Sequence, residues 1–103
     1  MADLNYSEEE IFVRVTTILQ EALSVERTRI TRESRLFLDL GAESLDVLDI
    51  RFRIDDAFSL KIKEDELLRN VGEGLSAEEI EERLTVGSIV QFIQNRLQAR
   101  AGS

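Results

Sequence analysis

Apolar residues recur at three- and four-residue intervals near both ends of the chain, and this spacing predicts an amphipathic helix in each region. The first helix is expected over residues 7–23, where Ser7 and Glu10 have the spacing of a capping box. The last helix is expected to follow Thr85, which can cap it. The predicted buried stripes contain Ile11, Val15, Ile18, Leu19 and Ala22 in the first helix, and Val86, Ile89, Val90, Ile93 and Leu97 in the last.

A third helix is predicted over residues 44–58, because a helical pattern begins shortly after a glycine, with Ser44 in the position of an N-cap. Two apolar stripes run along this helix, and the one assigned to the core contains Val47, Ile50, Ile54, Ala57 and Phe58. The other stripe contains Leu45, Leu48 and Phe52. Packing against another helix would account for Leu48 and Phe52, and we expect it for Leu48, whereas Leu45 is expected to be exposed.

Two long connections join these helices. Residues 24–43 are too apolar for a free linker, so we expect Ile30, Leu36 and Leu40 to hold this segment against the core. The second connection, residues 59–85, is broken by glycines after a short helical turn expected near residues 63–68.

A further short helix is expected over residues 77–84, because Ser76-Ala77-Glu78-Glu79 begins as another capping box. The 103 residues therefore predict a single all-α domain over residues 1–103, a small four-helix bundle with three longer helices. Residues 1–6 and 99–103 are expected to be disordered. Since 43% of the residues are hydrophobic, the core is expected to be modest.

Charge and composition exclude several classes of function. A net charge of −8 repels nucleic acid and anionic membrane surfaces, and it favours partners that carry basic patches. The chain has no cysteine and no histidine, which removes thiol nucleophiles and the usual general base, and its acidic clusters lack the spacing of a calcium loop. No long apolar run is present, so a monomeric, cytoplasmic protein that is not an enzyme and binds no metal is expected.

The stretch Asp39-Leu40-Gly41-Ala42-Glu43-Ser44-Leu45-Asp46 resembles the D-x-G-x-D-S-L-(D/E) attachment site of acyl carrier proteins. The resemblance implies a bundle of acyl-carrier type, with a long loop between its first two helices and an extended segment before the last. It also implies that Ser44 carries a covalent 4′-phosphopantetheine arm, transferred from coenzyme A by a phosphopantetheinyl transferase. The chain would then carry acyl intermediates as thioesters between enzymes of fatty-acid, specialised-lipid or polyketide-type biosynthesis.

The same resemblance assigns a docking role to acidic residues around Ser44. Glu43, Asp46 and Asp49 would be recognised by basic patches on acyl-transferring or condensing enzymes, with Leu45 as an apolar contact. The spacing alone also fits a solvated helix face with two intrahelical ion pairs. Those pairs would join Asp49 to Arg53 and Arg51 to Asp55.

The chain departs from the family pattern in three places, of which the first keeps the charge and the other two leave the partners and the cargo open. Glu43 stands where aspartate is usual, Arg51 and Arg53 add positive charge, and the 59–85 segment is longer than usual. The extra length would enlarge the acyl pocket, add a docking surface, or be a tolerated insertion. An aminoacyl or peptidyl carrier remains an alternative, as does an unmodified helical interaction module in which Ser44 only caps a helix.

Overall fold

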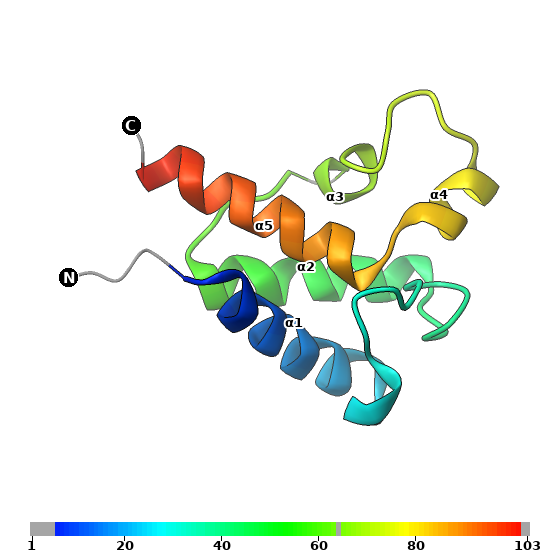
Figure 1. The fold of residues 1–103 in the computed structure, drawn as a ribbon. Helices are drawn as coiled ribbons and strands as arrows, with labels where there is room; N and C mark the ends of the chain where they lie inside the picture. Colours follow the sequence, from blue (N-terminus) through cyan, green and yellow to red (C-terminus); the bar gives the residue numbers. More distant parts are fainter. Residues whose placement is uncertain (1–5, 64, 102–103) are drawn as a thin grey trace.

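The structure, a computed structural model, describes residues 6–63 and 65–101 and is all-helical in this part of the chain. Its elements are α1 (Glu8–Leu23), the 3-10 turn η1 (Arg27–Arg29), α2 (Ser44–Phe58), α3 (Glu66–Arg69), α4 (Ala77–Arg83) and α5 (Val86–Ala101). Helix α1 packs against both α2 and α5, and the short helices α3 and α4 follow α2 and precede α5 along the chain (Figure 1). The predicted small helical bundle is therefore confirmed.

The core lies where the three long helices meet. Its most deeply buried residues include Ile11, Val15 and Leu19 of α1, Ile50, Ile54 and Phe58 of α2, and Val86, Ile89, Val90 and Ile93 of α5. Each large apolar side chain buried in this way contributes about 1.5–3 kcal/mol to folding. The predicted core stripes of all three helices are confirmed, with Ala22 and Ala57 only partly buried.

The predicted capping boxes begin the helices as expected. The Glu10 N–H donates to Ser7 Oγ at 3.1 Å, and the Ser7 N–H donates to Glu10 Oε1 at 2.9 Å. The same reciprocal pair joins Ser76 and Glu79 at the start of α4, with distances of 2.9 and 3.2 Å. Before α5, Thr85 and Ser88 exchange bonds of 3.0 and 3.1 Å between side chains and backbone N–H groups. Each box satisfies N–H groups that the helix itself leaves without acceptors.

The long loop between α1 and α2 is held to the core, as predicted. Ile30, Leu36 and Leu40 are all buried. Backbone hydrogen bonds also join the loop to the junction between α4 and α5: the Leu36 N–H donates to the Leu84 carbonyl, and the Val86 N–H to the Ser34 carbonyl, each at 2.9 Å. The loop that leads to α2 is therefore attached both to the core and to the α4–α5 junction.

A close backbone approach adds to this junction. The Gly87 N–H donates to the Arg32 carbonyl at 2.9 Å, and a Cβ on Gly87 would lie only 3.0 Å from that oxygen. Glycine at position 87 therefore allows this close approach, and a side chain there would push the loop away by a few tenths of an ångström.

The ends of the described chain are more ordered than predicted. Tyr6 packs edge-on against Phe58, with ring centroids 5.2 Å apart, although residues 1–6 were expected to be disordered. Helix α5 continues to Ala101, although disorder was expected from residue 99. Residues 1–5, 64 and 102–103 lie outside the described part.

The arginines of α2 serve the fold. The predicted ion pair of Arg51 and Asp55 is wrong, because both side chains bind the backbone of Ile62 instead. Arg51 Nη1 donates to the Ile62 carbonyl at 2.7 Å, and the Ile62 N–H donates to Asp55 Oδ1 at 3.0 Å. The predicted pair of Arg53 and Asp49 is confirmed at 3.0 Å, and Arg53 also reaches Glu21 of α1 at 3.1 Å.

Candidate functional site

Ser44 is the first residue of α2 and is exposed. The prediction that Ser44 is the N-cap is wrong, because Glu43 occupies that position with an extended backbone (φ −117°, ψ 172°). The Glu43 N–H donates to Asp46 Oδ2 at 2.8 Å, so the carboxylate of the third helical residue closes the cap. Within the described structure, the Ser44 hydroxyl makes no hydrogen bond.

The start of α2 is electropositive on its backbone. The N–H groups of Asp46 and Val47 donate to the Glu43 carbonyl at 2.9 and 3.1 Å, whereas those of Ser44 and Leu45 have no acceptor within the helix. Such a helix end favours a nearby anion. Ser44 thus combines an exposed, unbonded hydroxyl with a local field that would stabilise a phosphate ester.

The turn before α2 is shaped by Gly41, which has φ +76° and lies in open space. Its N–H donates to the Phe37 carbonyl at 3.2 Å, and the next residue, Ala42, donates to the Leu36 carbonyl at 3.0 Å. A positive φ of this kind suits glycine and strains residues that carry a Cβ. Gly41 therefore allows the chain to reverse just before Ser44.

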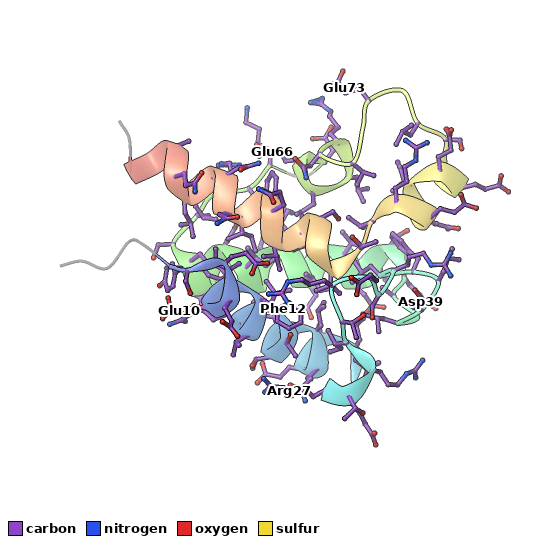
Figure 2. All side chains as sticks on the ribbon, in the orientation of Figure 1. Glu10, Phe12, Arg27, Asp39, Glu66 and Glu73 are labelled. Carbon is purple, nitrogen blue, oxygen red and sulfur yellow. The ribbon has the colours of Figure 1, made fainter. Side chains whose placement is uncertain are left out.

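Asp39 lies on the same loop, at the end of the molecule where α2 begins (Figure 2). Its carboxylate accepts from the Arg35 N–H at 2.7 Å, from Arg35 Nε at 3.0 Å and from Arg35 Nη2 at 3.2 Å. The hydrogen bonds from the Arg35 side chain, together with that from its backbone, hold the pKa of Asp39 below its usual range. Sequence reasoning placed Asp39 in the motif but missed this contact; its only signal was the four-residue spacing of the two charges.

A groove of about 210 Å³ lies beside Ser44. Its lining comprises Phe37, Ser44, Leu45, Val47, Leu48 and Leu68. Leu48 was expected to pack against another helix, but it is 38% exposed and borders this groove together with Leu68 of α3. Phe52 is 56% exposed. Leu45 is 78% exposed, as predicted. An open apolar stripe therefore runs from the serine along α2.

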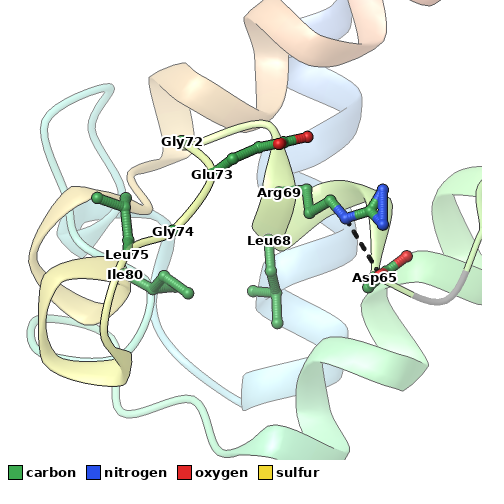
Figure 3. A pocket seen from close by; sticks show the side chains of 8 residues that line it. All are labelled: Asp65, Leu68, Arg69, Gly72, Glu73, Gly74, Leu75 and Ile80. Carbon is green, nitrogen blue, oxygen red and sulfur yellow. Dashed lines mark ion pairs between the residues drawn. The ribbon is translucent and has the colours of Figure 1, made fainter.

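A second cavity of about 360 Å³ lies between α3, the glycine-containing turn and α4 (Figure 3). It is lined by Asp65, Leu68, Arg69, Gly72, Glu73, Gly74, Leu75 and Ile80. Asp65 and Arg69 form an ion pair of 3.3 Å at its edge. Leu68 lines both hollows, so the extended segment after α2 builds space next to the groove at Ser44.

The acidic residues predicted for docking differ in how free they are. Glu43 is exposed, whereas the Asp46 carboxylate is engaged by the Glu43 N–H. Asp49 is exposed but paired with Arg53.

Among residues 6–63 and 65–101, no group of three or more acidic residues is arranged to hold a metal ion, and no helix is long and apolar enough to cross a membrane.

Comparison with known proteins matches residues 13–73 to the family described as the phosphopantetheine attachment site. The chain is 35% identical over 91 residues to an acyl carrier protein of Thermotoga maritima, covering 88% of this chain and 96% of that relative. It is 38% identical over 88 residues to an acyl carrier protein of Borreliella burgdorferi, covering 85% and 94%. It is 44% identical over 63 residues to acyl carrier protein AcpXL of Brucella melitensis, covering 61% and 68%.

Proposed function

Because the chain belongs to the acyl carrier protein family, we propose that Ser44 is the residue that bears its 4′-phosphopantetheine. Proteins of this family carry that group covalently and act as carriers rather than catalysts. The single observation that supports Ser44 most strongly is its exposed hydroxyl at the N-terminus of α2 within the Asp39–Asp46 motif, to which no group in the described part of the chain hydrogen-bonds.

Attachment requires the Ser44 oxygen to form a bond to the phosphorus that carries the pantetheine arm in coenzyme A. The pyrophosphate bond at that phosphorus breaks, and adenosine 3′,5′-bisphosphate leaves with the electron pair. The hydroxyl proton goes to a base of the phosphopantetheinyl transferase, since the chain has no histidine or cysteine, and the transferase also brings the metal ion. The free N–H groups at the start of α2 would stabilise the resulting phosphate diester.

The attached arm supplies a thiol on which acyl groups are held as thioesters. The chain's own residues present that arm and limit its contact with water. Phe37, Leu45 and Leu48 line the groove beside Ser44 and offer it an apolar surface. We assign to the protein the transport of acyl intermediates between separate enzymes of fatty-acid, specialised-lipid or polyketide-type biosynthesis.

Partner enzymes would dock on the face of α2 that surrounds Ser44. Glu43, Asp46 and Asp49 supply negative charge for a basic patch, and Leu45 supplies a prominent apolar contact. The exposed side chain of Phe52 extends this apolar surface. The proposed partners are the transferase and acyl-transferring or condensing enzymes. The carrier itself is proposed to be a monomer in the cytoplasm.

Intact mass measurement tests the proposal. The purified protein, incubated with coenzyme A, magnesium and a promiscuous phosphopantetheinyl transferase, is expected to gain the mass of one phosphopantetheine group. Ser44→Ala should gain nothing, whereas Thr28→Ala, which removes another exposed hydroxyl, should be modified like the wild type. An unmodified wild type beside an active control carrier would instead favour an interaction module.

A further inference from the structure

The geometry points to Arg35 as a positioning residue for Ser44, acting through Asp39. This inference rests on the proposed attachment at Ser44. Asp39 belongs to the acidic motif around the serine, and a simple reading would have its carboxylate meet a partner directly. The structure instead shows it bound within its own loop, by a residue outside the motif.

Arg35 and Asp39 are joined by hydrogen bonds in both directions. Asp39 Oδ2 accepts from the Arg35 backbone N–H at 2.7 Å and from Nε at 3.0 Å, and Oδ1 accepts from Nη2 at 3.2 Å. In return, the Asp39 N–H donates to the Arg35 carbonyl at 2.9 Å. Both carboxylate oxygens are therefore engaged by the guanidinium, a geometry that fixes direction as well as charge.

The backbone that continues toward Ser44 is folded back onto the same unit. Three successive N–H groups donate to carbonyls at positions 35 to 37: Leu40 to Arg35 at 3.1 Å, Gly41 to Phe37 at 3.2 Å, and Ala42 to Leu36 at 3.0 Å. The clasp of Arg35 and Asp39 closes this turn. Glu43 and Ser44 are the first residues to leave it.

The clasp is also anchored from outside. Arg29 Nη2 donates to the Asp39 carbonyl at 3.0 Å, and the Leu36 N–H donates to the Leu84 carbonyl at 2.9 Å, at the end of α4. Arg35 and Thr85 form an isolated antiparallel bridge. The loop that carries Asp39 is thus joined to the junction of α4 and α5, and the Asp39 carboxylate is directed at Arg35 of the same loop.

Both side chains of the clasp are partly exposed, at 44% for Arg35 and 40% for Asp39. Water screens such a pair, so its removal should affect the stability of the whole domain only slightly. Its effect should instead be local, on the freedom of residues 40–44. A reacting oxygen that is less well placed reacts more slowly even when docking is unchanged.

A double-mutant cycle measured with the transferase and coenzyme A tests the inference. Arg35→Ala and Asp39→Asn should each lower kcat for modification of Ser44 by roughly tenfold, with little change in KM for the carrier, because the docking face on α2 is retained. The kcat of the double variant should be no lower than that of either single variant, since each substitution removes the same Arg35–Asp39 contact. Arg35→Lys should restore part of the rate.

Controls separate the possible outcomes. Arg69→Ala removes an exposed ion pair of the same i,i+4 spacing in α3 and should react like the wild type. If Asp39 instead meets the transferase, Asp39→Asn will raise KM while Arg35→Ala reacts normally, and that result overturns the inference. A wild type that is never modified would defeat the proposed attachment itself, whereas normal modification of all these variants would defeat only the role of Arg35.

Discussion

The Glu43 N–H donates to the Asp46 carboxylate at 2.8 Å, so these two acidic residues cap α2. Ser44, which lies between them in the sequence, is not needed for the cap. A serine that capped the helix would have its hydroxyl turned toward backbone N–H groups. Here the hydroxyl is exposed and unbonded instead. The cap and the candidate attachment residue are thus separate residues, although they are neighbours in the chain.

This separation predicts that Ser44→Ala leaves the free energy of unfolding nearly unchanged. Ser7→Ala is the matched comparison, because Ser7 Oγ accepts from the Glu10 N–H at 3.1 Å and caps α1. Its loss should cost about 1 kcal/mol. Urea unfolding of both variants measures the difference, and an equal loss in Ser44→Ala would show that its hydroxyl does cap α2.

Arg51 is predicted to stabilise the fold through its bond to the Ile62 carbonyl. Arg51→Ala leaves that carbonyl without its donor and removes the packing of the guanidinium on the Phe52 ring, 4.7 Å away. A destabilisation of about 1–3 kcal/mol is expected from urea unfolding. Arg27→Ala, an exposed arginine on η1, is the control and should remain within about 0.5 kcal/mol of the wild type. Equal stability of the two variants would contradict the assignment.

Leu45 is predicted to contribute to docking and not to folding. Because 78% of Leu45 is exposed, Leu45→Ala should unfold like the wild type. Its KM in the transferase reaction should nevertheless rise by about fivefold to tenfold, the effect expected if Leu45 is one of the few contacts that carry much of the binding energy. Val13→Ala removes an exposed apolar residue of α1, 40% exposed, and should leave KM unchanged. Kinetics that respond equally to both variants would argue against a specific face on α2.

Acid should weaken the attachment of α3 to α5 through Glu66. The pKa of Glu66 is held below its ordinary 4.5 chiefly by the Lys63 N–H, which donates at 2.8 Å, with a further contribution from Arg96 at 2.7 Å. A carboxyl whose folded pKa is lowered stabilises the fold above the ordinary value, and that contribution is lost as the pH falls through the folded pKa. The loss is therefore expected below pH 4.5.

The comparison of wild type and Glu66→Gln tests this dependence. The variant should be less stable near neutral pH, and the difference between the two proteins should shrink as the pH falls below 4.5. Urea midpoints measured across that range give the result. A difference that is constant with pH would mean that the charge of Glu66 does not contribute.

Local patterns predicted the helices well, because their causes lie within a few residues. Ser7 with Glu10 and Ser76 with Glu79 cap as their spacing indicates, and the stripe of Val47, Ile50 and Ile54 is buried. The attachment motif was visible for the same reason, since it is contiguous in the chain. Such features require no knowledge of the tertiary arrangement.

The errors concern contacts that depend on distant residues. The Leu48 side chain is apolar, but its helical position does not reveal that it borders an open groove and stays 38% exposed. Arg51 and Asp55 have the spacing of an ion pair, yet the chain returns after α2 and brings the Ile62 backbone within reach of both side chains. Arg51 binds the Ile62 carbonyl, and Asp55 binds the Ile62 N–H. Unpaired backbone groups are strong competitors for nearby charges.

The central claim is that Ser44 is the attachment residue, and peptide mapping tests it most directly. Trypsin cleavage after Arg35 and Arg51 releases residues 36–51, in which Ser44 is the only residue with a hydroxyl side chain. After reaction with coenzyme A and the transferase, tandem mass spectrometry should find one phosphopantetheine group on this peptide. A modified protein whose 36–51 peptide is unchanged would contradict the account.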